Sequence, residues 1–280
     1  MNSIPRALPL LAALLMLTPG AHAATASHGG YTATDAIAFQ WTELAAGYNA
    51  PIAGATRILG NNDDSASAAI DLGFNFTFFG QTYSQAYISS NGLLTFGGGT
   101  TNNNNANNYA LGDYMNFSTQ PMIAAAWDDW TTTYSGTDGV YYATQGNAGS
   151  KSFVVEWRNT KKYDTASNSN SSPVTFEAVL YEGSNAILFS YLDMETGGSS
   201  VNPDASRGAT ATTGIRDVNA YANGNYLQWS HDQMVLLDHT SVLITPVPEA
   251  DTYALMLLGI GLVGLATRRR HPRNANLGLT

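Results

Sequence analysis

The middle of the chain consists of short runs in which apolar and polar residues alternate with a period of two, separated by Gly, Asn and Ser. In the run SFVVEWRN, which begins at Ser152, the side chains of Phe153, Val155 and Trp157 share one face, and Glu156 lies on the other. Successive side chains of a β-strand point to opposite faces of its sheet, so this alternation is typical of strands. No stretch has the apolar spacing of an amphipathic helix. The pattern therefore predicts an all-β fold.

Short turns connect these runs into antiparallel pairs. Asn91-Gly92 predicts a type I′ hairpin turn, in which both central residues have positive φ, and Gly183-Ser184-Asn185 predicts a second tight turn. The expected strands lie at 74–79, 87–88, 93–96, 122–127, 140–143, 153–158, 174–180, 187–191, 212–215, 226–229 and 242–245. Antiparallel strands without helices predict a single antiparallel β-sandwich, jelly-roll-like, over residues 24–245.

The chain is acidic, with 21 Asp and Glu against 12 Lys and Arg and a net charge of −9. Such a surface repels nucleic acid and anionic lipid headgroups, so neither is an expected partner. Glu156, Glu177 and Glu182 lie on or beside predicted strands and are expected on solvated outer faces. There is no cysteine, which excludes disulfides and thiolate metal sites and leaves the core alone to stabilise the domain.

Residues 1–23 have the pattern of a cleaved secretory signal. Arg6 gives a weakly basic start, an apolar run extends from Leu8 to Leu17, and Ala21 and Ala23 supply the small residues of the cleavage site. The alternative is a first transmembrane helix, which needs about 20 apolar residues. We therefore expect export through the Sec translocon and cleavage after Ala23.

The C-terminal residues combine a Pro-Glu pair, a short apolar run and three arginines. The apolar run from Tyr253 to Ala266 spans about 21 Å as a helix, against a hydrocarbon core of about 30 Å. A transmembrane helix at 253–267 is therefore short, and the arginines that follow it are expected to hold the tail 271–280 in the cytoplasm. These arginines are Arg268, Arg269 and Arg270. Proline at 248 ends the helix and leaves Pro248-Glu249 extended outside the membrane. The alternative is an ordinary single-span anchor, but a helix this short favours a processing signal.

Asp128-Asp129 is the acidic pair in the exported region that is the best candidate for a binding site. It ends an apolar strand between Trp127 and Trp130, where carboxylates can bind calcium and an aromatic ring can stack on a sugar. The favoured alternative is a strand-ending turn in which an aspartate accepts a hydrogen bond from a backbone N–H. Asn61 to Asp64 also offers oxygen ligands, but it lacks the alternating spacing of a calcium-binding helix–loop–helix, which favours an Asx-rich turn.

A catalytic constellation is not evident. Ser230-His231-Asp232 has the residue types of a hydrolase triad, yet neighbours on a strand point to opposite faces and cannot converge. The HExxH, GxSxG and P-loop patterns are absent. We therefore expect neither catalysis nor a cofactor, and calcium is the one ion that the sequence leaves open.

The order of the central motifs resembles that of a known extracellular module. The motifs are YISSNGLLTFG, PMIAAAWDDW, GVYYAT, SFVVEWRNTKKYD, VTFEAVLYEGSNAILFSYLDM and GATATTGIRD, in this order. They are similar to the nidogen-like β-module of bacterial secreted proteins, over about 70–217. The resemblance implies a non-catalytic extracellular domain.

The C-terminal stretch, 246–270, resembles the PEP-CTERM sorting signal. Val247, Pro248 and Glu249 are followed by the apolar run and the arginines, and Ala250 stands where the family usually has a second proline. The resemblance implies processing by an exosortase in a Gram-negative bacterium that makes exopolysaccharide. We therefore expect an exported, non-enzymatic cell-surface or exopolysaccharide-matrix protein, held transiently in the inner membrane. The alternative is a calcium-dependent carbohydrate-binding or carbohydrate-active protein that uses Asp128 or Asp129.

Overall fold

The computed structural model describes residues 25–47, 50–99, 106–115, 120–133, 138–163, 172–197 and 205–247. The expected signal sequence, with Ala21 and Ala23, lies outside these residues. So do Pro248, Glu249, Ala250, the expected helix 253–267, and Arg268, Arg269 and Arg270. Within the described ranges, no helix is long and apolar enough to cross a membrane.

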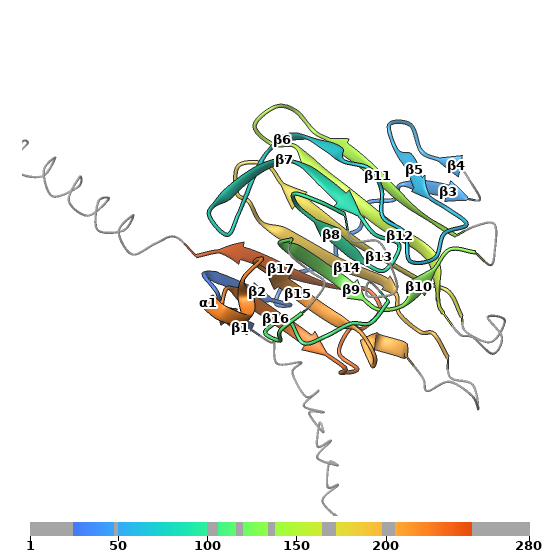
Figure 1. Ribbon diagram of the computed structural model, residues 1–280. Coiled ribbons are helices and arrows are strands. Elements are labelled where there is room, and N and C mark those ends of the chain that lie inside the picture. The colour runs from blue at the N-terminus through green and yellow to red at the C-terminus, as the bar shows by residue number, and fades with distance from the viewer. Residues whose placement is uncertain are drawn as a thin grey trace, which may run out of the picture.

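Two antiparallel sheets stack into a β-sandwich (Figure 1). The larger sheet has the order β1 (Thr25–His28), β2 (Tyr31–Thr34), β17 (Thr240–Pro246), β14 (Ile187–Asp193), β13 (Val174–Tyr181), β12 (Ser152–Lys162), β11 (Gly139–Gln145), β5 (Thr56–Leu59), with β10 (Trp130–Thr131) paired to β12. The smaller sheet has the order β16 (Tyr226–His231), β15 (Thr212–Arg216), β9 (Met122–Trp127), β8 (Leu93–Thr95), β7 (Gln81–Ile88), β6 (Ile70–Phe78). Strands β3 (Ala45–Gly47) and β4 (Ala50–Pro51) form a ribbon of their own, and the helical segments described are α1 (Ala220–Asn223) and a 3₁₀ turn, Ser206–Gly208. The prediction of an all-β antiparallel fold is confirmed.

The connectivity differs from the predicted jelly roll. Strands β11 to β14 follow one another within the larger sheet, and β6 to β9 do so within the smaller one. These are meanders, whereas a jelly roll is built from Greek keys. The short turn at 183–185 keeps β13 and β14 adjacent, because sequential strands joined by a tight turn stay side by side. The pattern also missed β1 to β5, which are short, and β1 is mostly exposed.

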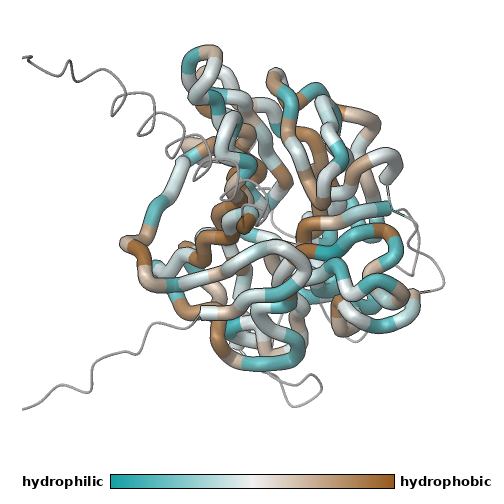
Figure 2. Tube along the Cα trace, turned by 90° about the vertical axis from the view of Figure 1, so that its left-hand side faces the viewer, coloured by the Kyte–Doolittle hydropathy of each residue, from teal (hydrophilic) through white to brown (hydrophobic). Residues whose placement is uncertain are grey.

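The main hydrophobic core lies between the two sheets and is rich in aromatic side chains. Figure 2 shows the hydrophobic stretches of the chain in brown, several of them in the interior. Trp157 of β12 stacks on Phe176 of β13, with ring centroids 5.1 Å apart, and Phe78 of β6 packs against Phe96 at 5.2 Å. All four side chains are fully buried. Large buried aromatic surfaces supply much of the stabilisation that a chain without cysteine needs.

Three of the buried aromatic residues of the larger sheet also form hydrogen bonds to the smaller sheet or the loop that follows its strand β7. The donors and acceptors are Trp157 Nε1 to Ser89 O (2.8 Å), Tyr191 Oη to Ala125 O (2.9 Å), and Trp130 Nε1 to Ala126 O (2.6 Å). A buried donor without a partner costs about 1–3 kcal/mol. These bonds therefore favour one fixed placement of the sheets.

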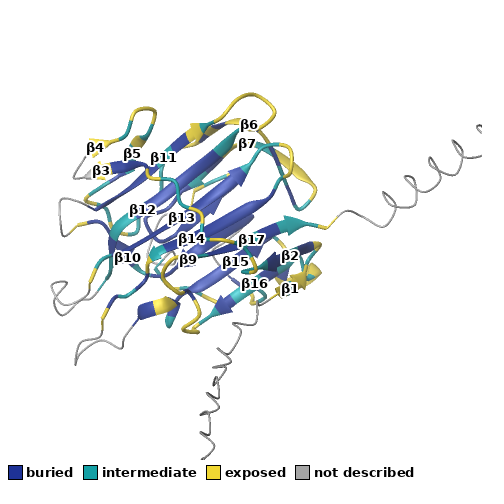
Figure 3. Ribbon diagram, turned by 180° about the vertical axis from the view of Figure 1, so that it is seen from behind, coloured by how far each residue is buried: buried dark blue, intermediate teal, exposed yellow. Residues whose placement is uncertain are grey.

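The outer face of the larger sheet is covered by the irregular residues 35–44, which we name the covering segment. Its backbone N–H groups donate to side chains of neighbouring strands: Gln40 N to Ser241 Oγ (3.1 Å), Thr42 N to Glu177 Oε2 (3.2 Å), and Leu44 N to Glu156 Oε2 (2.8 Å). Leu44 packs in a second cluster with Val154, Val179 and Leu188 of the same face. Figure 3 shows the central strands buried along most of their length.

The expectation that Glu156 and Glu177 lie on a solvated face is therefore wrong. Both are fully buried and face each other across β12 and β13, whereas Glu182 is half-buried and accepts Gly149 N–H. Burial raises the pKa of Glu156 to about 7, although Arg158 and Leu44 N–H lower it. Burial raises the pKa of Glu177 to about 9, because only Thr42 N–H opposes desolvation and Glu156 adds to it.

Glu177→Gln tests this burial through the pH dependence of stability. The unfolded carboxyl releases its proton near 4.5 and the folded one near 9, so the free energy of unfolding falls as pH rises between these values. Glutamine carries no charge, so we expect the free energy of unfolding of the variant to exceed that of the wild type by several kcal/mol at pH 8, about 1.4 kcal/mol for each pH unit, and to converge with it towards pH 5. Urea unfolding at each pH measures the difference.

Glu195→Gln is the matched control, because that side chain is exposed and should change stability little. If the free energy of unfolding of Glu177→Gln changed with pH in parallel with that of the wild type, the raised pKa of the buried Glu177 would be contradicted.

Candidate functional site

Residues 128 and 129 form the turn between β9 and β10. Asp128 Oδ1 accepts the backbone N–H of Asp129 at 2.9 Å, and Trp130 N donates to Asp128 O at 3.0 Å. The aspartate that accepts a backbone N–H at the end of a strand is the arrangement that the sequence favoured for this pair.

Asp128 is buried and fully engaged. Its Oδ1 forms an ion pair with Lys162 of β12, and its Oδ2 accepts a 2.6 Å hydrogen bond from Thr210 Oγ1. A buried carboxylate with a cation and a hydroxyl donor is compensated for the loss of water. We therefore assign Asp128 a structural role, connecting the two sheets at this end of the sandwich.

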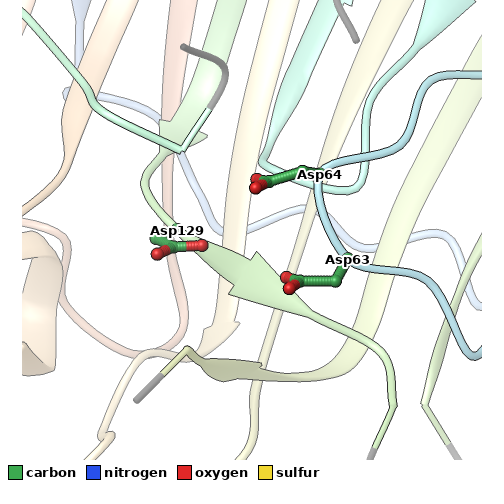
Figure 4. Close-up of side chains that lie close together, drawn as sticks. All are labelled: Asp63, Asp64 and Asp129. Carbon is green, nitrogen blue, oxygen red and sulfur yellow. The ribbon is translucent and has the colours of Figure 1, made fainter. Parts of the chain in front are cut away.

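Asp129 has a different environment and lies beside the loop that precedes β6. Its carboxylate and those of Asp63 and Asp64 place one oxygen each within 4.8 Å of one another, and Figure 4 shows the three side chains converging. We name these three residues the acidic cluster. Asp129 Oδ1 is shielded from solvent and has no hydrogen-bond partner within the described part of the chain. Convergent carboxylate oxygens of this kind are the ligand type that calcium prefers.

Asn91 positions one member of the acidic cluster, a role that the sequence did not reveal. Its Nδ2 donates to Asp64 Oδ1 at 2.8 Å, and its Oδ1 accepts Trp130 N at 2.9 Å. The predicted type I′ turn is wrong, because Gly92 has φ of 77° and Asn91 is not among the residues with positive φ. A Cβ on Gly92 would lie 2.3 Å from Ala126 O, so glycine is required for close packing against β9.

The acidic cluster is electrostatically unfavourable by itself. Desolvation raises the pKa of Asp129 to about 7, Lys162 lowers it, and Asp64, Asp63 and Asp128 raise it further. The pKa of Asp63 is also raised, by desolvation and then by Asp64. A bound cation would stabilise the charged forms of Asp129 and Asp63, whose pKa values are raised.

An open cleft of about 430 Å³ borders Asp129 on its other side. Asp128, Asp129, Lys162, Thr210 and Asp232 contribute polar groups to its lining. The cleft is open to solvent and its lining is mostly polar. Through Asp129 it adjoins the acidic cluster.

The residues Ser230, His231 and Asp232 do not form a catalytic triad. His231 Nδ1 lies 2.8 Å from Thr212 Oγ1, and its Nε2 lies 3.5 Å from Asp232 Oδ2. Ser230 is buried, and its Oγ has no hydrogen-bond partner among the described residues. The expectation that strand neighbours cannot converge is therefore wrong for His231 and Asp232, because β16 ends at His231 and Asp232 has a positive φ of 51°.

Comparison with known families places nearly all of the sandwich, from β2 onward, in one of them. A family model described as NIDO related matches residues 30–249, well over half of the 280 residues of the chain. The chain belongs to the NIDO-related family. The matched range of this NIDO-related protein runs from β2 to the end of β17 and is longer than the 70–217 that the sequence motifs covered. Neither a curated protein nor a solved structure matches the chain.

A second family model, the PEP-CTERM protein-sorting motif, matches residues 246–270 of this NIDO-related protein. The motif directs the protein to export and to the cell surface, and it implies processing by an exosortase. Of the residues expected in the motif, Val247 is described: it is half exposed, and its N–H donates to Gly30 O at 2.8 Å. The motif therefore begins where the last strand of the sandwich ends.

The different roles of Asp128 and Asp129 predict opposite effects of removing each charge. We expect Asp128→Asn to lower the free energy of unfolding by about 1–3 kcal/mol, because Lys162 loses its partner and Thr210 its charged acceptor. Asp129→Asn relieves like-charge repulsion, so it should be as stable as the wild type or more stable. Urea unfolding at pH 8 in EDTA makes the comparison, and a larger loss for Asp129→Asn would reverse the assignment.

Proposed function

We propose that this NIDO-related protein is a non-enzymatic cell-surface or exopolysaccharide-matrix protein that an exosortase releases from the inner membrane. The Sec translocon exports the chain, and cleavage after Ala23 removes the signal sequence. The short helix at 253–267 then holds the protein in the membrane, with Arg268 to Arg270 on the cytoplasmic side. The exosortase cuts near Pro248-Glu249.

The observation that carries this proposal is the junction of two matched families at one point of the chain. The NIDO-related range ends at 249, the sorting motif begins at 246, and β17 ends at Pro246. A complete folded domain therefore precedes the signal directly, as expected when the domain is the cargo and the signal is the part to be removed.

Mass spectrometry of the mature C-terminus tests the sorting proposal. In a host that makes an exosortase, the wild type should end near Pro248-Glu249 and lack Arg268 to Arg270. The double variant Pro248→Ala/Glu249→Ala should keep its full C-terminus and fractionate with the inner membrane, as should the wild type in a host without the enzyme.

The matched control changes the same residue types far from the motif, at Pro51→Ala and Glu195→Ala, and should be processed like the wild type. An intact C-terminus in wild-type protein from the exosortase-making host would overturn the proposal.

The acidic cluster favours a second candidate, calcium-dependent binding of carbohydrate. Asp63, Asp64 and Asp129 supply converging oxygens beside an open polar cleft. One of these oxygens, Asp129 Oδ1, is buried and has no hydrogen-bond partner among the residues that the structure describes. Asp128 is not a ligand in this proposal, because Lys162 and Thr210 occupy its oxygens. A calcium ion would offset the repulsion within the cluster and leave coordination positions for water or sugar hydroxyls.

Calcium titration followed by thermal unfolding tests this candidate. A ligand that binds only the folded state raises its stability by about 2.7 kcal/mol at a hundred times its dissociation constant, so millimolar calcium should raise the wild-type Tm by several degrees. Asp129→Asn should abolish that rise, and Asp193→Asn, outside the cluster, should preserve it.

A glycan array with calcium and with EDTA then separates the possible roles. Glycan binding that occurs with calcium but not with EDTA would support the carbohydrate-binding role. Release of reducing ends from a glycan would instead show that the protein is an enzyme. An unchanged Tm in calcium would remove this second candidate.

A further inference from the structure

The last three described residues of the sandwich are held differently from the rest of β17. Strand β17 lies between β14 and β2, but its pairing with β14 ends at Ile244, opposite Ile187. Thr245 and Pro246 pair with β2 alone, opposite Thr32 and Tyr31. The end of the strand is therefore paired on one side only.

Side-chain burial decreases along the same residues. Ile244 is fully buried in the core, Thr245 and Pro246 are partly exposed, and Val247 is 48% exposed. Backbone pairing to β2, rather than core packing, thus holds the strand end in place. Segments with few buried contacts open at a small fraction of the cost of global unfolding.

The position of Pro246 fits a strand end with one partner. Val247 N donates to Gly30 O at 2.8 Å, and antiparallel ladder bonds alternate along a strand, so the N–H position of residue 246 faces away from β2. Strand β14 no longer pairs there, and proline, which has no N–H, leaves no unsatisfied donor. The sequence therefore ends the two-sided ladder before the sorting motif begins.

The match to the sorting motif begins at residue 246, and Pro248 follows Val247 by a single Cα step of about 3.8 Å. Enzymes and receptors that bind an extended peptide do so through its main-chain N–H and C=O groups. The main chain of Thr245 to Val247 is already engaged by β2. A processing enzyme therefore competes with β2 for the residues just before the Pro-Glu pair.

We propose that opening of the β17 end, Thr245 to Val247, away from β2 gates the exosortase processing of the folded protein. This inference rests on the proposed sorting function and names the regulation of the same site. The folded domain slows its own release, and the rate of release follows the local stability of the strand end.

Two changes to the full-length precursor in an exosortase-making host test the gate by pulse-chase labelling. The first inserts Gly-Ser-Gly-Ser-Gly-Ser between Val247 and Pro248, which moves the motif away from the sheet. Because the enzyme could then bind the motif without first breaking the backbone hydrogen bonds of the strand end, the insertion should speed processing about tenfold.

The second change locks the strand end with a disulfide, Thr32→Cys/Thr245→Cys. These residues are direct antiparallel partners, whose Cα separation suits a disulfide. The natural chain has no cysteine to interfere. Oxidised protein should be processed about tenfold more slowly than the same protein in dithiothreitol, and the reduced form controls for damage by the substitutions.

The matched control disulfide, Thr34→Cys/Leu243→Cys, joins the same two strands two residues earlier and leaves 245–247 able to open. It should be processed at the wild-type rate. Processing that is insensitive to both the linker and the Thr32–Thr245 lock would overturn the gate and mean that cleavage precedes folding. Absence of processing in every variant and in the wild type would instead overturn the sorting function.

Discussion

Hydrogen bonds from buried aromatic side chains to carbonyl oxygens across the core are the interactions on which the remaining structure depends. Trp157, Tyr191 and Trp130 bury large ring surfaces, and each donates to a carbonyl of the smaller sheet or of the loop after β7. A chain without cysteine has no disulfide to fasten one sheet to the other. Hydrophobic contacts have no preferred direction, whereas hydrogen bonds do. These bonds therefore favour a single position of one sheet relative to the other.

The same interactions set the geometry of the acidic cluster. Trp130 is anchored in the core through its indole N–H and to Asn91 through its backbone N–H, and Asn91 in turn holds Asp64. Asp129 immediately precedes Trp130, so its carboxylate is brought to Asp63 and Asp64 as a consequence of core packing. The neighbouring Asp128 faces Lys162 instead, which explains how two adjacent aspartates have separate roles.

The last strand brings folding and sorting to one place. Strand β17 pairs with β2 from the start of the domain and with β14 from its middle, so the larger sheet is complete only when residues up to Pro246 are present. The sorting motif begins at that residue. In the proposed gate, completion of the fold and access to the processing motif are coupled, because the same backbone atoms serve the sheet and would serve an enzyme.

The sequence by itself determined the all-β class, most strands from β6 onward, the tight turn at 183–185 and the sorting motif, since each depends on local periodicity or contiguous residues. It also favoured the turn role of Asp128, which rests on a bond to the next residue. Tertiary structure decided the meander connectivity, the burial of Glu156 and Glu177, and the meeting of Asp63 and Asp64 with Asp129. Alternation shows that a strand has two faces, but not that residues 35–44 cover the outer one. Contacts between residues far apart in the chain arise only when the core fixes how the sheets pack, and no local pattern encodes that arrangement.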